Sequence, residues 1–175
     1  MIKNLALAMA FISLTACQSA YYSAMESVGV HKRDILVDRV EETKESQEES
    51  QEEFQSALER LSTLINFDGG DLQDAYEQLN DDYESSLAAA EDVSVNIDNV
   101  EDVAEALFEE WADELEEYSS ASLKRESSNK LRATQRQFDQ LLRSMRASEA
   151  KMQPVLDSLQ DNVLYLKHNL NEQAI

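Results

Sequence analysis

The chain has 175 residues, and its 15 Lys or Arg against 36 Asp or Glu give a formal net charge of −21 at neutral pH. Nucleic acid and anionic lipid repel so acidic a chain, which excludes electrostatic binding to either as its main function. It contains only three Gly and one Pro. Because β-sheet proteins need many tight turns, this composition predicts an all-α protein.

The amino terminus has the pattern of an export signal. Lys3 supplies a positive charge, and residues 5–13 (LALAMAFIS) form an apolar run that is too short to span a bilayer, which needs about 20 residues. The next four residues, Leu14-Thr15-Ala16-Cys17, match a bacterial lipobox, in which a peptidase cuts before a cysteine that then carries lipid. We therefore predict a signal peptide at 1–16, lipidation of Cys17 and a lipidated tether at 17–30.

Lipid chains on Cys17 predict a protein that is anchored to a membrane without spanning it. Gln18 follows the cysteine, where an Asp is the usual signal for retention in the inner membrane. We therefore expect the periplasmic side of an outer membrane. Because Cys17 is the only cysteine, no disulfide within the chain is expected.

Residues 31–175 show an apolar repeat of about 3.5 residues, which predicts long helices packed as in a coiled coil. The clearest repeat runs from Leu72 through Trp111 to Tyr118, a second covers 36–65 and a third covers 123–170. Short breaks between them predict antiparallel neighbours. The predicted fold is an elongated antiparallel three-helix bundle, with helices about 70 Å long at 1.5 Å per residue.

The middle of this bundle has polar and small side chains where a coiled coil usually buries apolar ones. We call these residues the waist, and they are Lys44, Gln47 and Gln51 in the first helix, Ser86 in the second and Ser148 in the third. A polar layer that only fixes the helix register and a hinge or docking site for a partner both fit this pattern. Pro154 lies nearby and predicts a kink or interruption in the third helix.

The run Glu41–Glu53 (EETKESQEESQEE) contains no apolar residue. Such a run is typical of disorder or of a solvated helix. A helix is favoured because the repeat keeps its phase on both sides of the run. The acidic first and second helices and the basic stretch at 124–151 predict charge pairing between helices, although each exposed pair contributes less than about 1 kcal/mol.

The chain lacks recognisable catalytic motifs. It has no Gly-rich phosphate loop, no His-Glu-x-x-His and, once Cys17 is lipidated, no free thiol. In an up-down-up bundle His31 and His168 would lie at opposite ends and could not share a metal ion. Residues 68–74 (DGGDLQD) lack the ligand spacing of a calcium loop and predict a turn with a helix cap. No enzymatic activity, cofactor, metal or small-molecule substrate is expected.

Four blocks of sequence resemble a known family. They are VGVHKRDILVDRVEE (28–42), NFDGGDL (66–72), VEDVAEALFEEWADELEEY (100–118) and LKHNLN (166–171). They resemble a family of gammaproteobacterial predicted lipoproteins catalogued only as a domain of unknown function. The resemblance implies a lipid anchor and helical character, and it brings no catalytic or binding residues. It also leads us to expect that the natural chain continues past Ile175.

The sequence therefore predicts a lipid-anchored periplasmic helical rod with a structural or adaptor role. Its partner would be another protein, a second copy of the chain or a cell-wall component, bound at the exposed Glu/Lys faces or at the waist, and not a nucleic acid. The alternative hypothesis is an acidic module that binds a cation or a small cationic ligand through its acidic faces or the 68–74 turn.

Overall fold

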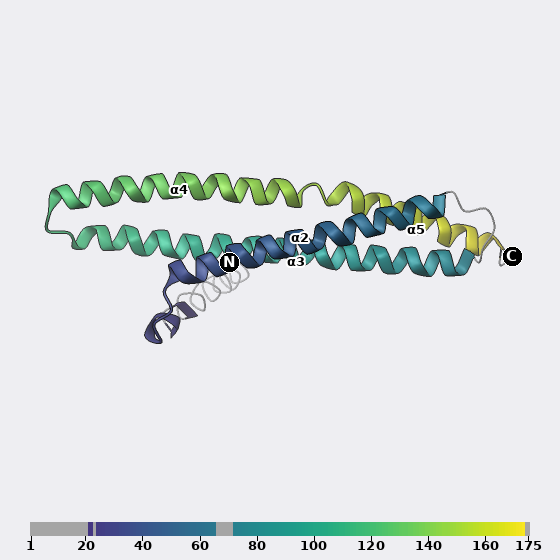
Figure 1. Ribbon diagram of the computed structural model, residues 1–175, viewed down its shortest axis with the longest axis horizontal. Helices are drawn as coiled ribbons and strands as arrows, with labels where there is room; N and C mark the ends of the chain where they lie inside the picture. The colour runs from purple at the N-terminus through teal and green to yellow at the C-terminus, as the bar shows by residue number, and fades with distance from the viewer. Residues whose placement is uncertain (1–20, 23, 66–71, 174–175) are drawn as a thin grey trace, which may run out of the picture. The chain divides into compact units, whose positions relative to one another are not determined.

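The computed structural model describes residues 21–22, 24–65 and 72–173. These residues form four long α-helices, α2 (Lys32–Ile65), α3 (Leu72–Glu114), α4 (Ala121–Glu149) and α5 (Gln153–Gln173), and a short 3-10 helix η1 (Leu115–Glu117) follows α3 (Figure 1). No β-strand occurs in this part of the chain. The prediction of an all-α bundle of long helices is confirmed.

The chain divides into two compact units. Unit 1 contains the described residues up to Arg39 together with Val100–Phe138, and unit 2 contains Val40–Asn99 together with the described residues from Asp139 onward. Three helices, α2, α3 and α4, contribute residues to both units, whereas α5 belongs to unit 2 alone.

Unit 2 is a bundle in which α2 and α3 run antiparallel. Its core consists of Ala57, Leu61, Leu79, Leu159 and Val163, against which Tyr76, Tyr83, Val155 and Leu166 pack. Thr43 early in α2 bonds to the carbonyl of Asn96 late in α3, whereas Arg60 late in α2 bonds to Asp82 early in α3. This crossing order requires opposite helix directions, as the short break between the two repeats predicts.

The third predicted helix is two helices, α4 and α5, separated by turns at residues 150–152, where Figure 1 shows a short loop. Pro154 lies in the first turn of α5, where a helix has no need of its missing N–H group. The amides of Lys151 and Met152 bond to carbonyls three residues back, at 3.1 and 2.9 Å, which is the tighter 3-10 pattern. The predicted interruption is confirmed, and the number of long helices is corrected from three to four.

The chain does not reverse direction at this interruption. Gln47 Nε2 donates to the carbonyl oxygen of Met145 in α4 at 3.3 Å. Further along α2, Leu61 shares a core cluster with Leu159 and Val163 of α5. Residues further along α2 therefore meet residues further along the last third of the chain. The helices of unit 2 follow the predicted up-down-up order.

Unit 1 contains the hairpin formed by α3 and α4. Ser120 caps α4 by accepting a 3.5 Å hydrogen bond from the Leu123 amide in its first turn, a common role of serine before a helix. Across the hairpin, Trp111 Nε1 donates to Ser127 Oγ at 2.8 Å. The rings of Phe108 and Phe138 meet edge to face with centroids 5.6 Å apart. These contacts pack the two α3 aromatics against α4 in unit 1.

A glycine turn at residues 28–30 leads into α2 in unit 1. Gly29 has a φ of +86°, and its amide bonds to the carbonyl of Glu26 while that of Val30 bonds to the carbonyl of Met25. This pair of bonds is a helix C-terminal cap that needs a left-handed residue, and glycine adopts it without strain. Tyr22, which precedes this turn, packs with Ile35 and Val103 in a small core.

The acidic run Glu41–Glu53 is helical throughout and lies inside α2, which confirms the solvated-helix interpretation. Two of its side chains are nonetheless buried, Thr43 at 0% exposure and Ser50 at 1%. We predicted Lys44 and Gln51 at these inner positions, and that prediction is wrong because both are exposed. Hydroxyl side chains are small enough to fit inside, whereas the ammonium of a lysine stays in water.

Some predictions concern residues outside the described part of the chain. They are the signal peptide at 1–16, lipidation of Cys17, the break at 66–71 and the end of the chain at Ile175. Of the 68–74 segment, Asp74 lies in the first turn of α3. Within the described ranges, no helix has the length and apolar character needed to cross a bilayer.

Candidate functional site

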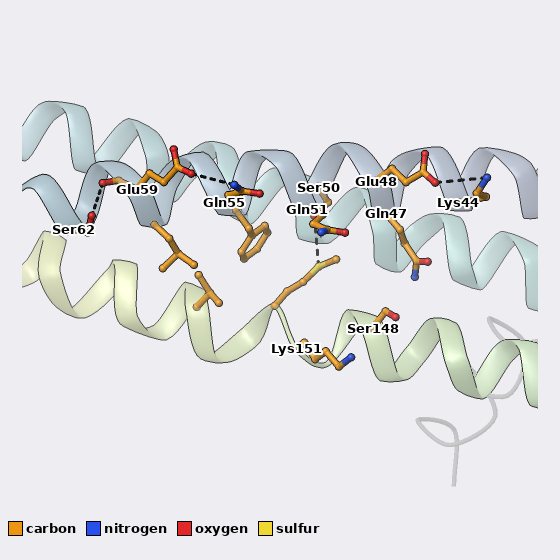
Figure 2. Close-up of a pocket in the computed structure, with 14 residues that line it drawn as sticks. Lys44, Gln47, Glu48, Ser50, Gln51, Gln55, Glu59, Ser62, Ser148 and Lys151 are labelled. Carbon is orange, nitrogen blue, oxygen red and sulfur yellow. Dashed lines mark hydrogen bonds and ion pairs between the residues drawn. The ribbon is translucent and has the colours of Figure 1, made fainter.

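An open groove of about 780 Å³ lies in unit 2 between α2 and the α4–α5 break (Figure 2). We call it the α2 groove. It is lined by Lys44, Gln47, Glu48, Ser50, Gln51, Phe54, Gln55, Leu58, Glu59 and Ser62 from α2 and by Ser148, Lys151, Met152 and Val155 from the other side. At 1.5 Å per residue, its α2 wall is about 27 Å long, which is the length of five helical turns.

Small side chains and the helix break leave this groove open. Ser50 and Ser148 stand where larger residues would fill the space between the two walls, and residues 150–152 leave the helical path there. Ser50 Oγ bonds to Met152 Sδ, which holds the methionine against α2. Figure 2 shows Ser148 and Lys151 on the wall opposite Gln47 and Gln51.

The groove combines an apolar floor with a polar rim. Phe54 is almost buried, whereas Leu58 is 41% exposed, and Met152 and Val155 are half-buried beside them. Hydrogen bonds and ion pairs already join neighbouring rim residues: Lys44 Nζ lies 3.6 Å from Glu48 Oε1, and Gln55 Nε2 donates to Glu59 Oε1 at 3.1 Å. An apolar floor with a polar rim is typical of a protein-binding surface.

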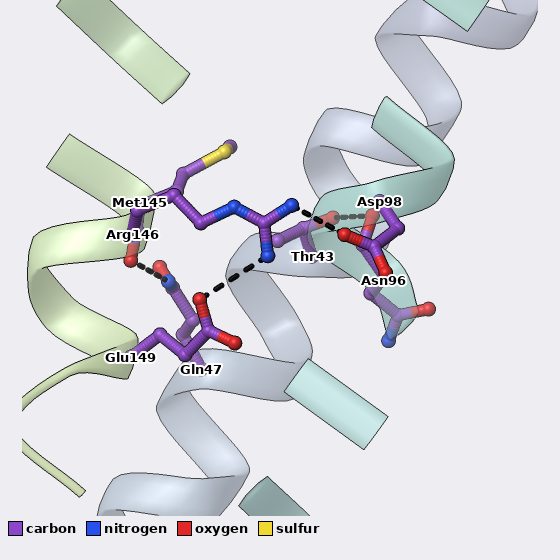
Figure 3. Close-up of polar contacts among 7 residues, drawn as sticks. All are labelled: Thr43, Gln47, Asn96, Asp98, Met145, Arg146 and Glu149. Atoms are coloured by element: carbon purple, nitrogen blue, oxygen red, sulfur yellow. Dashed lines mark hydrogen bonds and ion pairs between the residues drawn. The ribbon is translucent and has the colours of Figure 1, made fainter. Parts of the chain in front are cut away.

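Polar contacts hold the helices together next to the groove (Figure 3). Thr43 Oγ1 donates to the carbonyl of Asn96 at 3.1 Å, and Gln47 Nε2 donates to the carbonyl of Met145 at 3.3 Å. Arg146 in α4 pairs with Asp98 in α3 and, at 3.2 Å, with Glu149 in its own helix. These contacts connect α2, α3 and α4 and so fix the position of the α2 wall.

Four of the five waist residues line the α2 groove. They are Lys44, Gln47, Gln51 and Ser148. The fifth, Ser86, is not part of its lining but is fully buried on α3, and its Oγ has no hydrogen-bond partner among the described residues.

The waist omits the apolar floor of the groove. Phe54, Leu58 and Met152 all occupy positions of the apolar repeat, so the sequence interpretation assigned them to the core. For Leu58 the available signal is its spacing, because it lies seven residues after Gln51 and four before Ser62. These intervals are about two turns and one turn of a helix, so Leu58 shares a face with the waist residue Gln51.

Two half-buried cations outside the groove, Arg60 and Lys32, have raised pKa values. In unit 2 the hydrogen bond to Asp82 raises the pKa of Arg60, and the Arg60 Nε to Asp82 Oδ2 distance is 2.7 Å. In unit 1 burial acts to lower the pKa of Lys32, but bonds to Glu26 and Glu110 outweigh it and raise that pKa. Each of these two cations is held in its charged form by neighbouring carboxylates. This arrangement stabilises helix packing.

In the part of the chain that the structure describes, no three His, Cys, Asp or Glu side chains are grouped so that they could hold a metal ion. His31 lies just before α2 in unit 1 and His168 lies in α5 in unit 2, and both are exposed.

A family model described as "Protein of unknown function (DUF2959)" matches residues 21–175. The match covers most of the chain and includes the residues that line the α2 groove. The chain therefore belongs to this family, in agreement with the resemblance of its sequence blocks. Neither the curated proteins nor the solved structures contain a match to the chain.

Proposed function

We propose that this member of the DUF2959 family is a lipid-anchored protein of the periplasmic side of the outer membrane that acts by binding a protein partner, not by catalysis. The anchor is Cys17, in the lipobox-like sequence LTAC. The binding surface is the α2 groove. Acyl chains on a cysteine attach a folded domain to a membrane without a spanning helix.

The observation that carries this proposal is the composition of the α2 groove. Leu58 is exposed beside the apolar floor, and the charged rim residues of α2 already have polar neighbours. A partner that covers such a surface gains apolar burial at about 25 cal/mol per Å², while it leaves few charges without a polar contact. An open groove along five helical turns fits a helix face better than a small molecule, which usually binds in a more enclosed site.

The anchoring step is tested by changing the cysteine. The unaltered chain is expected in the membrane fraction, released by detergent but not by high salt, and on the outer-membrane band of a density gradient. Cys17→Ala removes the lipid attachment point and is expected to lose this behaviour. Equal membrane retention of the Cys17→Ala chain in high salt would disprove the anchor.

The binding step is tested by photo-crosslinking in cells. A photoreactive amino acid is placed at Gln51 or Gln55 in the α2 groove, and at Ala88, an exposed α3 residue outside the groove lining, as the matched control. We expect discrete protein adducts from the two groove positions and none from Ala88. Adducts of equal intensity from all three positions, or no discrete adduct from the groove, would contradict a binding role for this surface.

A further inference from the structure

The outer face of α2 carries a regular row of polar residues along the groove. We call it the α2 stripe: Lys44, Glu48, Gln51, Gln55 and Glu59. Steps of three and four residues keep these side chains on one helix face, and all five are exposed and line the α2 groove. The stripe begins with a cation and ends with an anion.

The stripe is complementary to itself when a second copy lies antiparallel. Lys44 and Glu59 are equally far in sequence from the midpoint between residues 51 and 52, and so are Glu48 and Gln55. A two-fold axis at that midpoint therefore brings Lys44 of one copy opposite Glu59 of the second copy, and Glu48 opposite Gln55 of the second copy. In a two-fold interface the same contacts form twice.

Charge favours a second copy over a cationic partner at this surface. The chain as a whole carries −21, so two copies repel each other over most of their surfaces. The groove lining contains two Lys and two Glu and is therefore formally neutral, so two copies can approach here with little repulsion. A cationic partner would be attracted more strongly to the other, more acidic faces.

The apolar part of the groove adds to this complementarity. Leu58 is 41% exposed and lies next to Glu59, so in the antiparallel arrangement the aliphatic stem of Lys44 from the second copy covers it. Long cationic side chains commonly bury their stems in this way while the ammonium stays at the rim. The contact removes apolar surface from water in both copies.

We propose that a second copy of this chain occupies the α2 groove, with the two α2 helices antiparallel about a two-fold axis close to Gln51. This inference rests on the proposed function, because it names the partner for the same surface. It assigns the α2 stripe the role of setting helix direction and register in the dimer.

Disulfide trapping in membranes tests the position of the axis. Gln51→Cys is introduced into the full chain, in which Cys17 is retained, and the membranes are treated with a mild oxidant. We expect a disulfide-linked dimer from Gln51→Cys, because a residue next to a two-fold axis faces its own copy. The unaltered chain controls for any reaction of Cys17, and Ala88→Cys controls for random collisions, and neither is expected to give the dimer.

The register is tested with two differently tagged chains in one cell. Lys44→Cys and Glu59→Cys are expected to cross-link to each other when they are co-expressed. Lys44→Cys alone is not expected to cross-link, because in this register the two copies of residue 44 are fifteen positions, or about 22 Å, apart along the helices. Cross-linking of Lys44→Cys with itself, at the level of the mixed pair, would overturn the antiparallel register.

Charge reversal separates a direct contact from a general effect on the helix. Lys44→Glu is expected to reduce the Gln51→Cys dimer at least several-fold, and the additional change Glu59→Lys is expected to restore it, because the swapped pair again places opposite charges together. Failure of the double swap to restore the dimer would contradict the pairing.

The outcomes distinguish this inference from the proposed function. If photo-crosslinking from Gln51 yields an adduct with a different protein and Gln51→Cys yields no dimer, the proposed function stands and the second-copy inference is wrong. If neither method yields a product from the groove, both are wrong. A dimer trapped from Gln51→Cys but not from Ala88→Cys supports both.

Discussion

Within unit 2, α2 and α3 bury inner faces of different chemistry. The inner face of α3 includes Leu79, Val93 and Ile97, all at 0% exposure, whereas the corresponding stretch of α2 buries Thr43 and Ser50. Burial of a Leu, Val or Ile side chain contributes about 1.5–3 kcal/mol. A buried hydrogen bond contributes only about 0.5–1.5 kcal/mol net. Each buried apolar residue of α3 therefore contributes more stability than each buried hydroxyl of α2, whose main role is to fix position.

This difference also explains where the groove forms. Small hydroxyl side chains on α2 let it pack against α3 but fill little volume on the side facing the α4–α5 break. Towards the end of α2, Ala57 and Leu61 join the apolar core, and the packing there is conventional. The polar stretch of α2 thus contributes less stability than an apolar face would, and it leaves the α2 groove accessible.

The largest effect is expected from truncating the core face of α3. Leu79→Ala removes a fully buried side chain from the core cluster and is expected to lower the free energy of unfolding by about 2–5 kcal/mol. Urea unfolding of the purified chain, followed by far-UV circular dichroism, measures the change. Val95→Ala on the same helix is the control, since Val95 is 55% exposed, and a loss as large as that for Leu79→Ala would remove the contrast between the faces.

A smaller loss is expected when the Arg60–Asp82 pair is broken. The Asp82 side chain is only 9% exposed and Arg60 is 36% exposed, so Arg60→Gln leaves a nearly buried carboxylate with a weaker partner. We expect a loss of about 1–3 kcal/mol. The matched control is Lys130→Gln, which breaks the exposed 2.8 Å pair with Glu126 and should cost clearly less stability, because solvent screens an exposed pair. Similar losses for the two variants would show that burial of Asp82 is unimportant.

The inner face of α3 was predictable because apolar residues mark it. From Val93 the residues Ile97, Val100 and Ala104 follow at steps of four, three and four, and Leu79 lies fourteen residues, or two heptads, before Val93. All five are fully buried. The interruption before Pro154 was predictable for an equally local reason, the missing amide hydrogen and the bulk of the ring.

The inner face of α2 was not predictable in the same way. In Glu41–Glu53 every residue is polar, so the pattern has no apolar residue that distinguishes one helix face from the next. The waist assignment was shifted by one residue, to Lys44 and Gln51 from Thr43 and Ser50. Lys44 and Gln51 nonetheless line the α2 groove. A shift of one residue turns a side chain by about 100° around the helix, which here moves it from the inner face to the face that borders the groove. That Ser86 lies outside the groove lining depends on how three helices pack, which a repeat in one helix does not specify.

A modest loss is expected from the buried hydroxyl on α2. Thr43→Val keeps the side-chain shape but removes the 3.1 Å hydrogen bond to the carbonyl of Asn96, and is expected to lower stability by about 0.5–1.5 kcal/mol. The control is Thr63→Val. The Thr63 hydroxyl bonds to a carbonyl within its own exposed helix turn, so its removal should change stability by less than about 0.5 kcal/mol. An increase in stability for Thr43→Val would mean that this bond contributes nothing net to packing.

The smallest effect, and one of opposite sign, is expected at Ser86. Its hydroxyl is fully buried and has no hydrogen-bond partner among the described residues, so Ser86→Ala removes an unfavourable burial at the cost of a small void. Alanine also has a helix propensity better by about 0.5 kcal/mol, and the expected net gain is up to about 1 kcal/mol. Ser85→Ala, at an exposed neighbouring position, gives the propensity contribution alone, so the difference between the two variants isolates burial. A loss of stability for Ser86→Ala would show instead that this hydroxyl helps to position α3.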